Sequence, residues 1–278
     1  MVPGKVSDGS PHSLDGAERK GMNTSPCLEP PSTMRKISAV TFDLWDTLIQ
    51  ELPGEPEKVS RSRTEGIHRL LERKGILHAR GEIERAYVDT GHFLSLTWSK
   101  KRDMSTRDQV LFMLNCLDDK LAQKLAIEDL AEIERIYSIG ILEHPPRLLP
   151  GAKDALRSVH AKGFRMGLIS NTGRTPGSVL RVMMAQMGVL DFFDTTTFSN
   201  EILVRKPAES AFRVTLEKLR AVPKAAVHIG DSEESDIAGA KKVGMYALQI
   251  LAEGEKGSRL ADGHVRSIGS VVDHIGRL

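Results

Sequence analysis

Five side chains of the types used in phosphoryl transfer follow short stretches that lie far apart along the chain. Asp43 closes the first apolar stretch, Ser170 closes the second, and Lys206 stands in a short Arg-Lys-Pro segment. Asp231 and Asp236 follow a later apolar stretch. A nucleophilic carboxylate, a hydroxyl, a cation and an acidic pair are the groups needed to move a phosphoryl group with a divalent metal.

The three carboxylates predict a metal site. If Asp43, Asp231 and Asp236 converge in one crevice, they repel one another and favour protonation unless a cation is present. Magnesium prefers oxygen ligands and commonly shares a few carboxylates with waters and a substrate phosphate. Together with Lys206, such an ion would offset the charge on the transferring oxygens. We therefore expect Mg²⁺ as the cofactor.

Apolar runs rich in β-formers alternate with helical patterns, which predicts an α/β fold. The expected strands are 37–44, 165–170, 195–198, 225–229 and 246–250. The expected helices are about 152–162, 177–188, 208–220 and 236–243. This alternation favours a doubly wound, Rossmann-like parallel sheet. Ligands of such sheets bind outside the carboxyl ends of the strands, which is where the reactive side chains fall.

One long segment breaks the alternation. Residues 55–145 carry apolar residues at helical spacing, and Ser105 with Asp108 offers an N-terminal capping pattern for one of the helices. We predict that this segment is an α-helical cap domain inserted into a core made of residues 36–54 and 146–278. A closing cap would exclude water and large polymers from a cleft, which favours a small substrate.

The composition is that of an ordinary globular protein, with 278 residues, 40% hydrophobic, 27% charged and a net charge of +2. The near-neutral charge gives no sign of a nucleic-acid partner, and no apolar run reaches membrane-spanning length. Cys27 and Cys116 provide no disulfide framework, which fits a reducing cytoplasm. Residues 1–35 hold five of the 13 prolines and predict a disordered tail. The sequence does not set the oligomeric state.

The order and spacing of the motifs resemble the haloacid dehalogenase superfamily, in particular members with a helical cap inserted after the first strand. The resemblance covers about residues 37–250. Its most specific part is Gly-Asp-Ser-x-x-x-Asp-Ile-x-Gly-Ala, which begins at Gly230. The segment around Lys206 and the strand end at Ser170 are weaker motifs that stand in the correct order.

The resemblance implies a role for each matching position. Asp43 would be the nucleophile that attacks phosphorus and forms an aspartyl-phosphate. Ser170 would hold a phosphoryl oxygen together with the adjoining amides of Asn171 and Thr172. Lys206 would neutralise charge between Asp43 and the phosphate. Arg174 could present a guanidinium to a substrate phosphate or carboxylate.

The metal ligands implied by the resemblance are Asp43, Asp231 and the main-chain oxygen of Trp45. Asp236 would be a further ligand, or a partner that holds the site without touching the ion. Because only its carbonyl would be used, the side chain at position 45 does not affect metal binding.

Trp45 departs from the pattern of the family's phosphatases, which usually carry a second Asp there as general acid and base. Asp46 falls one place later, and side-chain alternation along an extended strand end directs it elsewhere. Proton transfer contributes typically ~10²–10⁴-fold to the rate. Without a general acid and base, the protein would be a slow phosphatase, a phosphotransferase that uses an acceptor other than water, or a catalytically weak binding or regulatory protein.

Metal-independent 2-haloacid dehalogenases of the superfamily are a further alternative, because they also carry an aromatic residue at the position of Trp45. They usually lack the Gly-Asp that starts the last motif, which is present here as Gly230 and Asp231. We therefore predict a magnesium-dependent hydrolase, a phosphatase whose partner is a small phosphorylated metabolite.

Overall fold

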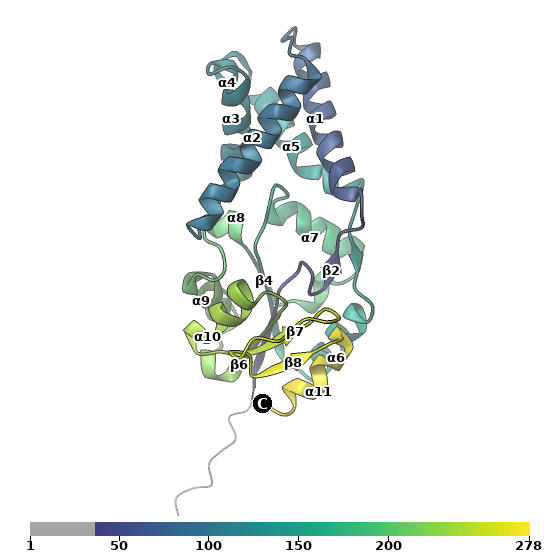
Figure 1. Cartoon of the computed structure of the whole chain (residues 1–278), viewed down its shortest axis with the longest axis vertical. Coiled ribbons are helices and arrows are strands. Elements are labelled where there is room, and N and C mark those ends of the chain that lie inside the picture. Colours follow the sequence, from purple (N-terminus) through teal and green to yellow (C-terminus); the bar gives the residue numbers. More distant parts are fainter. Residues whose placement is uncertain (1–36) are drawn as a thin grey trace, which may run out of the picture. The chain divides into compact units, whose positions relative to one another are not determined.

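A six-stranded parallel sheet forms the centre of the structure, a computed structural model that describes residues 37–278 (Figure 1). The predicted tail at 1–35 and Cys27 lie outside the described residues. The strand order is β5-β4-β1-β6-β7-β8. The strands are β1 Ala39–Phe42, β4 Arg165–Ser170, β5 Thr195–Phe198, β6 Ala226–Gly230, β7 Tyr246–Ile250 and β8 Gly263–Val265. This order is the doubly wound, Rossmann-like arrangement expected from the sequence.

The central strand β1 is buried along its whole length and pairs in parallel with β4 on one side and β6 on the other. The chain fills the sheet from β1 toward β5, and then returns to place β6 against the free side of β1. The carboxyl ends of β1 and β6 therefore flank the point at which the winding direction changes. In sheets of this kind ligands bind in the crevice at that point.

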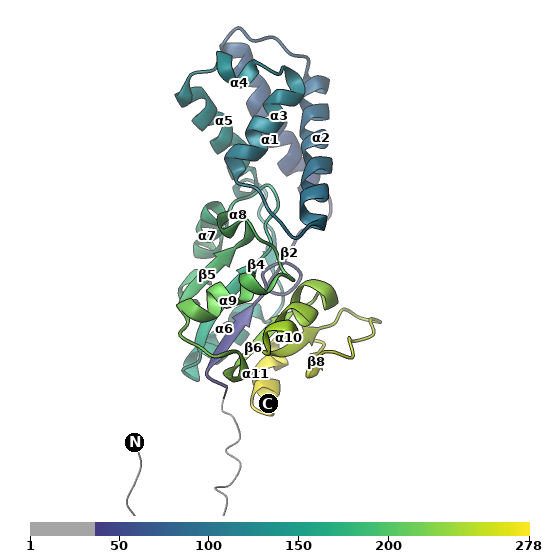
Figure 2. The same ribbon diagram turned by 90° about the vertical axis from the view of Figure 1, so that its left-hand side faces the viewer.

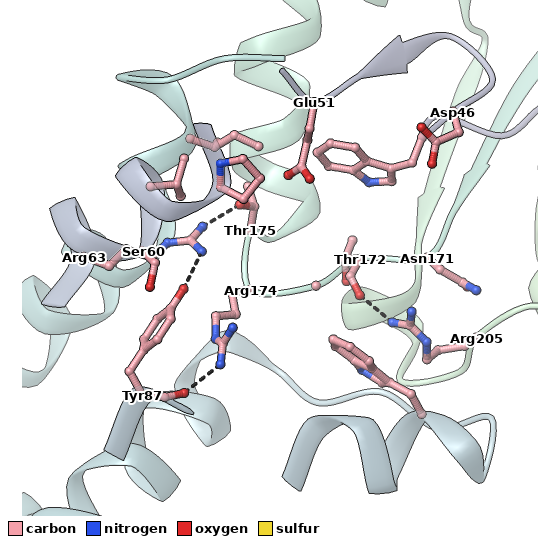
Figure 3. A pocket seen from close by; sticks show the side chains of 16 residues that line it. Asp46, Glu51, Ser60, Arg63, Tyr87, Asn171, Thr172, Arg174, Thr175 and Arg205 are labelled. Carbon is pink, nitrogen blue, oxygen red and sulfur yellow. Dashed lines mark hydrogen bonds between the residues drawn. The ribbon is translucent and has the colours of Figure 1, made fainter. Parts of the chain in front are cut away.

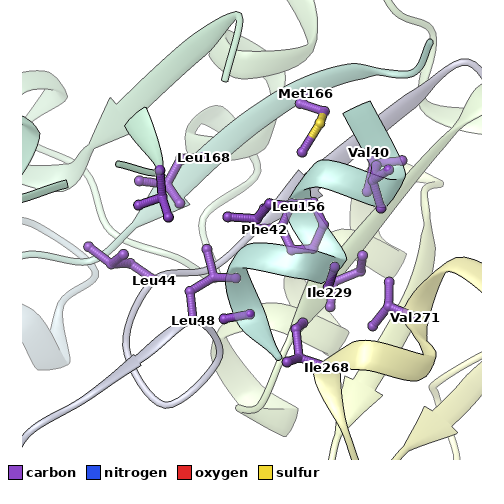
Figure 4. Close-up of a cluster of buried hydrophobic side chains, with 14 of the residues drawn as sticks. Val40, Phe42, Leu44, Leu48, Leu156, Met166, Leu168, Ile229, Ile268 and Val271 are labelled. Carbon is purple, nitrogen blue, oxygen red and sulfur yellow. The ribbon is translucent and has the colours of Figure 1, made fainter. Parts of the chain in front are cut away.

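Helices cover both faces of the sheet, because successive side chains of each buried strand point to opposite faces. Val40 and Phe42 belong to one apolar cluster, and Ala39 belongs to another (Figure 4). The first cluster is completed by α6 Ala152–Ala161, α7 Gly177–Gln186 and α11 Val271–Ile275. The second is completed by α9 Glu209–Lys218 and α10 Gly239–Val243. The short helix α8, Ser199–Ile202, follows β5.

Five helices are inserted after β1 (Figure 2). Their buried side chains form an apolar cluster of their own. They are α1 Glu55–Arg73, α2 Arg80–Ser99, α3 Thr106–Leu117, α4 Leu121–Lys124 and α5 Ile127–Ile139. Ser105 caps α3, because its side chain accepts a hydrogen bond from the Asp108 N–H at 3.1 Å, as the sequence predicted. The helical insertion is thus confirmed, and its assignment as a separate domain with limits at 55 and 145 stays a prediction.

Three features of the secondary structure differ from the sequence expectations. A short antiparallel ladder joins β2 Ile49–Gln50 to β3 Arg147–Leu148, where the chain leaves for the insertion and returns from it. The last strand, β8, was not predicted. The helix expected at 236–243 begins earlier, as a π-helix over Glu233–Ala238 that continues into α10. Among the described residues, no helix is both long and apolar enough to cross a membrane.

Candidate active site

Three carboxylates meet at the carboxyl ends of β1 and β6. One oxygen each of Asp43, Asp231 and Asp236 lies within 4.8 Å of the other two. The parallel register places Phe42 beside Ile229, and the Asp43 N–H donates to the Ile229 carbonyl at 2.9 Å. Since both strands end at this level, the residues that follow them must share one crevice. The convergence expected from the sequence is present.

Lys206 lies between two of these carboxylates. Its ammonium nitrogen is 2.5 Å from Asp43 Oδ1 and 2.5 Å from Asp236 Oδ1, and the side chain is buried. Asn171, which directly follows β4, fixes the backbone of this lysine, because its side-chain oxygen accepts a hydrogen bond from the Lys206 N–H at 2.8 Å. The Nδ2 atom of Asn171 donates to the Lys206 carbonyl at 3.1 Å. The side chain of Asn171 thus holds Lys206 in place, and substrate binding by its backbone amide stays a prediction.

The oxygens of Asp236 are already engaged within the protein. Oδ1 accepts from Lys206 and contacts His228 Nε2 at 3.0 Å, and Oδ2 accepts from the Ser232 N–H at 3.1 Å. A Cβ at position 230 would lie 2.3 Å from the Asp236 carboxyl carbon, so the close approach of this side chain requires Gly230. These contacts favour the second of the two roles considered for Asp236, in which it holds the site together without binding the metal ion directly.

Burial and mutual repulsion alter the ionisation of the carboxylates. Burial raises the pKa of Asp43 to about 7, with Asp236 adding to the effect and Lys206 opposing it. Burial and the charge of Asp236 raise the pKa of Asp231 to about 6. Burial also acts to raise the pKa of Asp236, but Lys206 and His228 outweigh it and hold the pKa below its usual range. Asp43 and Asp231 therefore fit a divalent cation, whose charge would favour their ionised forms.

The loop after β4 contributes less to this crevice than the sequence suggested. Ser170 is buried, and its hydroxyl donates only a long bond, 3.4 Å, to the Asn171 carbonyl. The Thr172 hydroxyl lies 3.2 Å from Oδ2 of Asp103 in the insertion and 3.2 Å from Oγ of Ser199 in the core helix α8. The Thr172 amide, predicted to bind a phosphoryl oxygen, donates instead to Ser199 Oγ at 2.7 Å in this structure, and its substrate role stays a prediction.

Asp103, which follows α2, joins the insertion to the core and carries no readable motif in the sequence. It is buried and accepts hydrogen bonds from Ser199, from Trp98 Nε1 at 3.0 Å and from Arg205 Nη1 at 2.9 Å. The guanidinium of Arg205 also donates to the Thr172 carbonyl and lies over the Trp98 ring. These contacts fix the loop after β4 against the end of α2.

A pocket of about 470 Å³ opens beside the acidic cluster (Figure 3). Asp43 itself does not line it. Its core side is formed by Trp45, Asp46 and residues 171–175, which follow the strand ends that carry Asp43 and Ser170. Its other side is formed by the insertion and includes Arg63. A second pocket, of about 480 Å³, is lined by Asp46 and Asp231.

Asp46 borders both pockets, contrary to the orientation expected from strand alternation. Its φ angle is 55°, so the chain has already turned out of the extended conformation at this residue. The Asp46 N–H donates to the Ile49 carbonyl at 2.8 Å, which fixes the turn. Because alternation holds only for extended backbone, it does not apply here. The charge of Asp46 contributes to raising the pKa of Asp231, which places the two carboxylates in one electrostatic environment.

Residues 37–244 match the family model described as haloacid dehalogenase-like hydrolase. The chain belongs to this family. The predicted superfamily is thereby confirmed, and so is the predicted α/β fold with a helical insertion.

Relatives in the haloacid dehalogenase-like hydrolase family carry different activities in their names. The chain is 28% identical over 222 residues to haloacid dehalogenase-like hydrolase domain-containing protein 3 of Xenopus laevis, covering 77% of this chain and 84% of that protein. It is 23% identical over 225 residues to a phosphoglycolate phosphatase of Escherichia coli O157:H7, covering 79% of this chain and 83% of that relative. A crystal structure of a 2-haloacid dehalogenase from Pseudomonas syringae superposes with a TM-score of 0.64 at 21% identity, over 87% and 99% of the two chains. That likeness shows the fold alone.

Proposed function

We propose that this protein is a magnesium-dependent phosphatase that hydrolyses a small phosphorylated metabolite through an aspartyl-phosphate on Asp43. The observation that carries the proposal is the meeting of Asp43, Asp231 and Lys206 at the ends of β1 and β6. Attack on the carbon of a haloacid needs no cation, so a dehalogenase gives no reason for the second carboxylate. A phosphoglycolate phosphatase among the relatives supports the same reaction class.

In the first step a carboxylate oxygen of Asp43 would attack phosphorus, and the bond from phosphorus to the leaving oxygen would break. Lys206, 2.5 Å from Asp43, fixes the orientation of the nucleophile and offsets negative charge on the phosphoryl oxygens. The Ser170 hydroxyl would donate to one of those oxygens. Asp43 with Asp231, and the main-chain oxygen of Trp45, would hold Mg²⁺, which when bound supplies further positive charge to the phosphoryl group.

In the second step a water molecule would attack the phosphorus of the aspartyl-phosphate, releasing inorganic phosphate and restoring Asp43. Both steps require a proton carrier, first for the leaving oxygen and then for the attacking water. We propose Asp46 for this task, because its side chain lines the pocket beside the acidic cluster. Trp45 lines the same pocket, and its indole would help to exclude bulk water.

The reaction class is tested by incubating the protein with a panel of small phosphate monoesters and with 2-chloropropionate in the presence of Mg²⁺. We expect inorganic phosphate from at least one monoester and no chloride from the haloacid. Chloride release without phosphate release would replace the proposal with dehalogenation.

The Asp46→Asn variant should retain its fold and lose activity by roughly 10²–10⁴-fold, the usual contribution of a proton-transferring group. The loss should be smaller for p-nitrophenyl phosphate than for an alkyl phosphate, because a nitrophenolate leaves without needing a proton. The ratio of kcat values for the two substrates provides the measurement. Equal losses on both substrates, or none on either, would exclude Asp46 as the proton donor to the leaving oxygen.

A further inference from the structure

Two arginines line the pocket beside the acidic cluster and have no carboxylate partner. Arg63 extends from α1 of the insertion, and Arg174 from the core loop after β4. Within residues 37–278, no carboxylate oxygen lies within 4.0 Å of a nitrogen of either guanidinium. Arg205, which lines the same pocket, is paired with Asp103 at 2.9 Å. Glu51 lines the same pocket without an ion pair to either guanidinium; burial raises the pKa of this carboxyl, and the charge of Arg63 opposes the rise. Arg63 and Arg174 therefore lie in one pocket wall, and neither forms an ion pair with a carboxylate.

Arg63 is buried, with only 5% of its surface exposed. Its Nη1 donates to the Tyr87 hydroxyl at 3.1 Å and its Nη2 to the Thr175 hydroxyl at 2.7 Å, so both partners are neutral. Its Nε is buried and has no hydrogen-bond partner among the described residues. A guanidinium stays charged at any physiological pH, and burying a charge is costly unless an opposite charge accompanies it.

Arg174 lies on the other side of Tyr87 (Figure 3). Its guanidinium stacks over the Tyr87 ring at 3.8 Å, and its Nη2 donates to the Tyr87 carbonyl at 2.7 Å. Its Nε donates to the Tyr137 hydroxyl at 3.2 Å. Burial raises the pKa of Tyr137 to about 12, so this hydroxyl supplies no negative charge. Tyr87 thus holds both guanidinium groups in place without neutralising either.

We propose that Arg63 and Arg174 form a subsite for a second anionic group of the substrate, a carboxylate or a second phosphate. The inference rests on the proposed phosphatase function and narrows its substrates to phosphate monoesters that carry this further charge. Guanidinium groups bind both kinds of anion through paired, charge-assisted hydrogen bonds. The subsite draws on both the insertion and the core, so an anion bound there would also hold the two together.

The test compares kcat/KM within two matched pairs of substrates. The first pair is 2-phosphoglycolate and 2-hydroxyethyl phosphate, which differ in the carboxylate. The second pair is 1,3-propanediol bisphosphate and its monophosphate. We expect a preference for the doubly anionic member of at least one pair, of roughly 10- to 100-fold, the scale of charge-assisted hydrogen bonds. The pair that shows the preference identifies the anion.

The variants Arg63→Lys and Arg174→Gln should lower that preference about tenfold, mainly through KM of the doubly anionic substrate. Arg61→Gln provides the matched control, since Arg61 is exposed on the same helix and does not line the pocket. Thermal melting confirms that each variant is folded. An unchanged preference in both folded variants, or an equal loss in Arg61→Gln, would overturn the subsite.

Wild-type turnover without preference in either pair overturns the subsite and leaves the phosphatase function standing. Absence of turnover on every monoester of the panel removes the phosphatase function and this inference with it.

Discussion

Replacing Asp43 with Asn should abolish phosphate release, with a loss on the order of 10⁶-fold, the scale on which removing a catalytic nucleophile acts. The amide is nearly isosteric with the carboxylate but cannot form the aspartyl-phosphate. The fold should survive, because Lys206 keeps its bond to Asp236 at 2.5 Å and one of three repelling carboxylates is removed. Phosphate release on the best monoester of the panel, together with thermal melting, provides the measurement.

Glu234→Gln is a suitable control, because Glu234 is an exposed acid in the π-helix that follows Asp231 and should be replaceable without effect. Beryllofluoride with Mg²⁺ offers a second measurement that needs no turnover. It should raise the melting temperature of the wild type by forming an adduct on Asp43, and should not protect Asp43→Asn. Appreciable turnover by Asp43→Asn would exclude it as the nucleophile. Protection without turnover on any substrate would favour a binding or regulatory protein.

Chelation of divalent cations should reduce turnover to background, and added Mg²⁺ should restore it. The reason is that Asp43 and Asp231, with oxygens within 4.8 Å of each other, cannot both be ionised cheaply without a cation. Asp231→Asn should need much more Mg²⁺ for half-maximal activity, whereas Glu234→Gln should match the wild type. The measurement is the activity of the wild type and of both variants as a function of Mg²⁺ concentration after EDTA treatment. Full turnover in excess EDTA would contradict the metal site.

The affinity for Mg²⁺ should rise with pH and then level off. Without a cation, burial raises the pKa of Asp43 to about 7 and that of Asp231 to about 6. Below pH 6 both carboxyls are protonated, so the ion must displace their protons; above pH 7 both are ionised and no proton competes. Calorimetry at pH 5.5, 6.5 and 8 should show the largest proton release on binding at pH 5.5, a smaller release at pH 6.5, where Asp43 is still largely protonated, and little at pH 8. Affinity independent of pH would show that these carboxyls are not the ligands.

Five of the six strands of the sheet, and the polar residues at its carboxyl edge, could be predicted from the order of residues along the chain. Strands buried on both faces must be continuous apolar runs, so the strands around Asp43, Ser170 and Asp231 could be located from composition alone. Parallel strands of one sheet end on the same side, which brings the following residues together without any knowledge of packing. The short strands β2, β3 and β8 were missed, because two or three residues carry no measurable periodicity.

Features that depend on contacts between distant residues became visible only in the folded chain. The orientation of Asp46 follows from a turn with φ of 55°, where the alternation of an extended chain no longer holds. The contacts of Asp236 with Lys206 and His228 engage its carboxylate in a way that the motif does not record. Arg63 reaches Thr175 over 112 positions of the chain, and only the packing of the helical insertion beside the sheet brings them together. A periodic pattern specifies how one segment folds and which face it buries, but not which side chains of two separate segments meet.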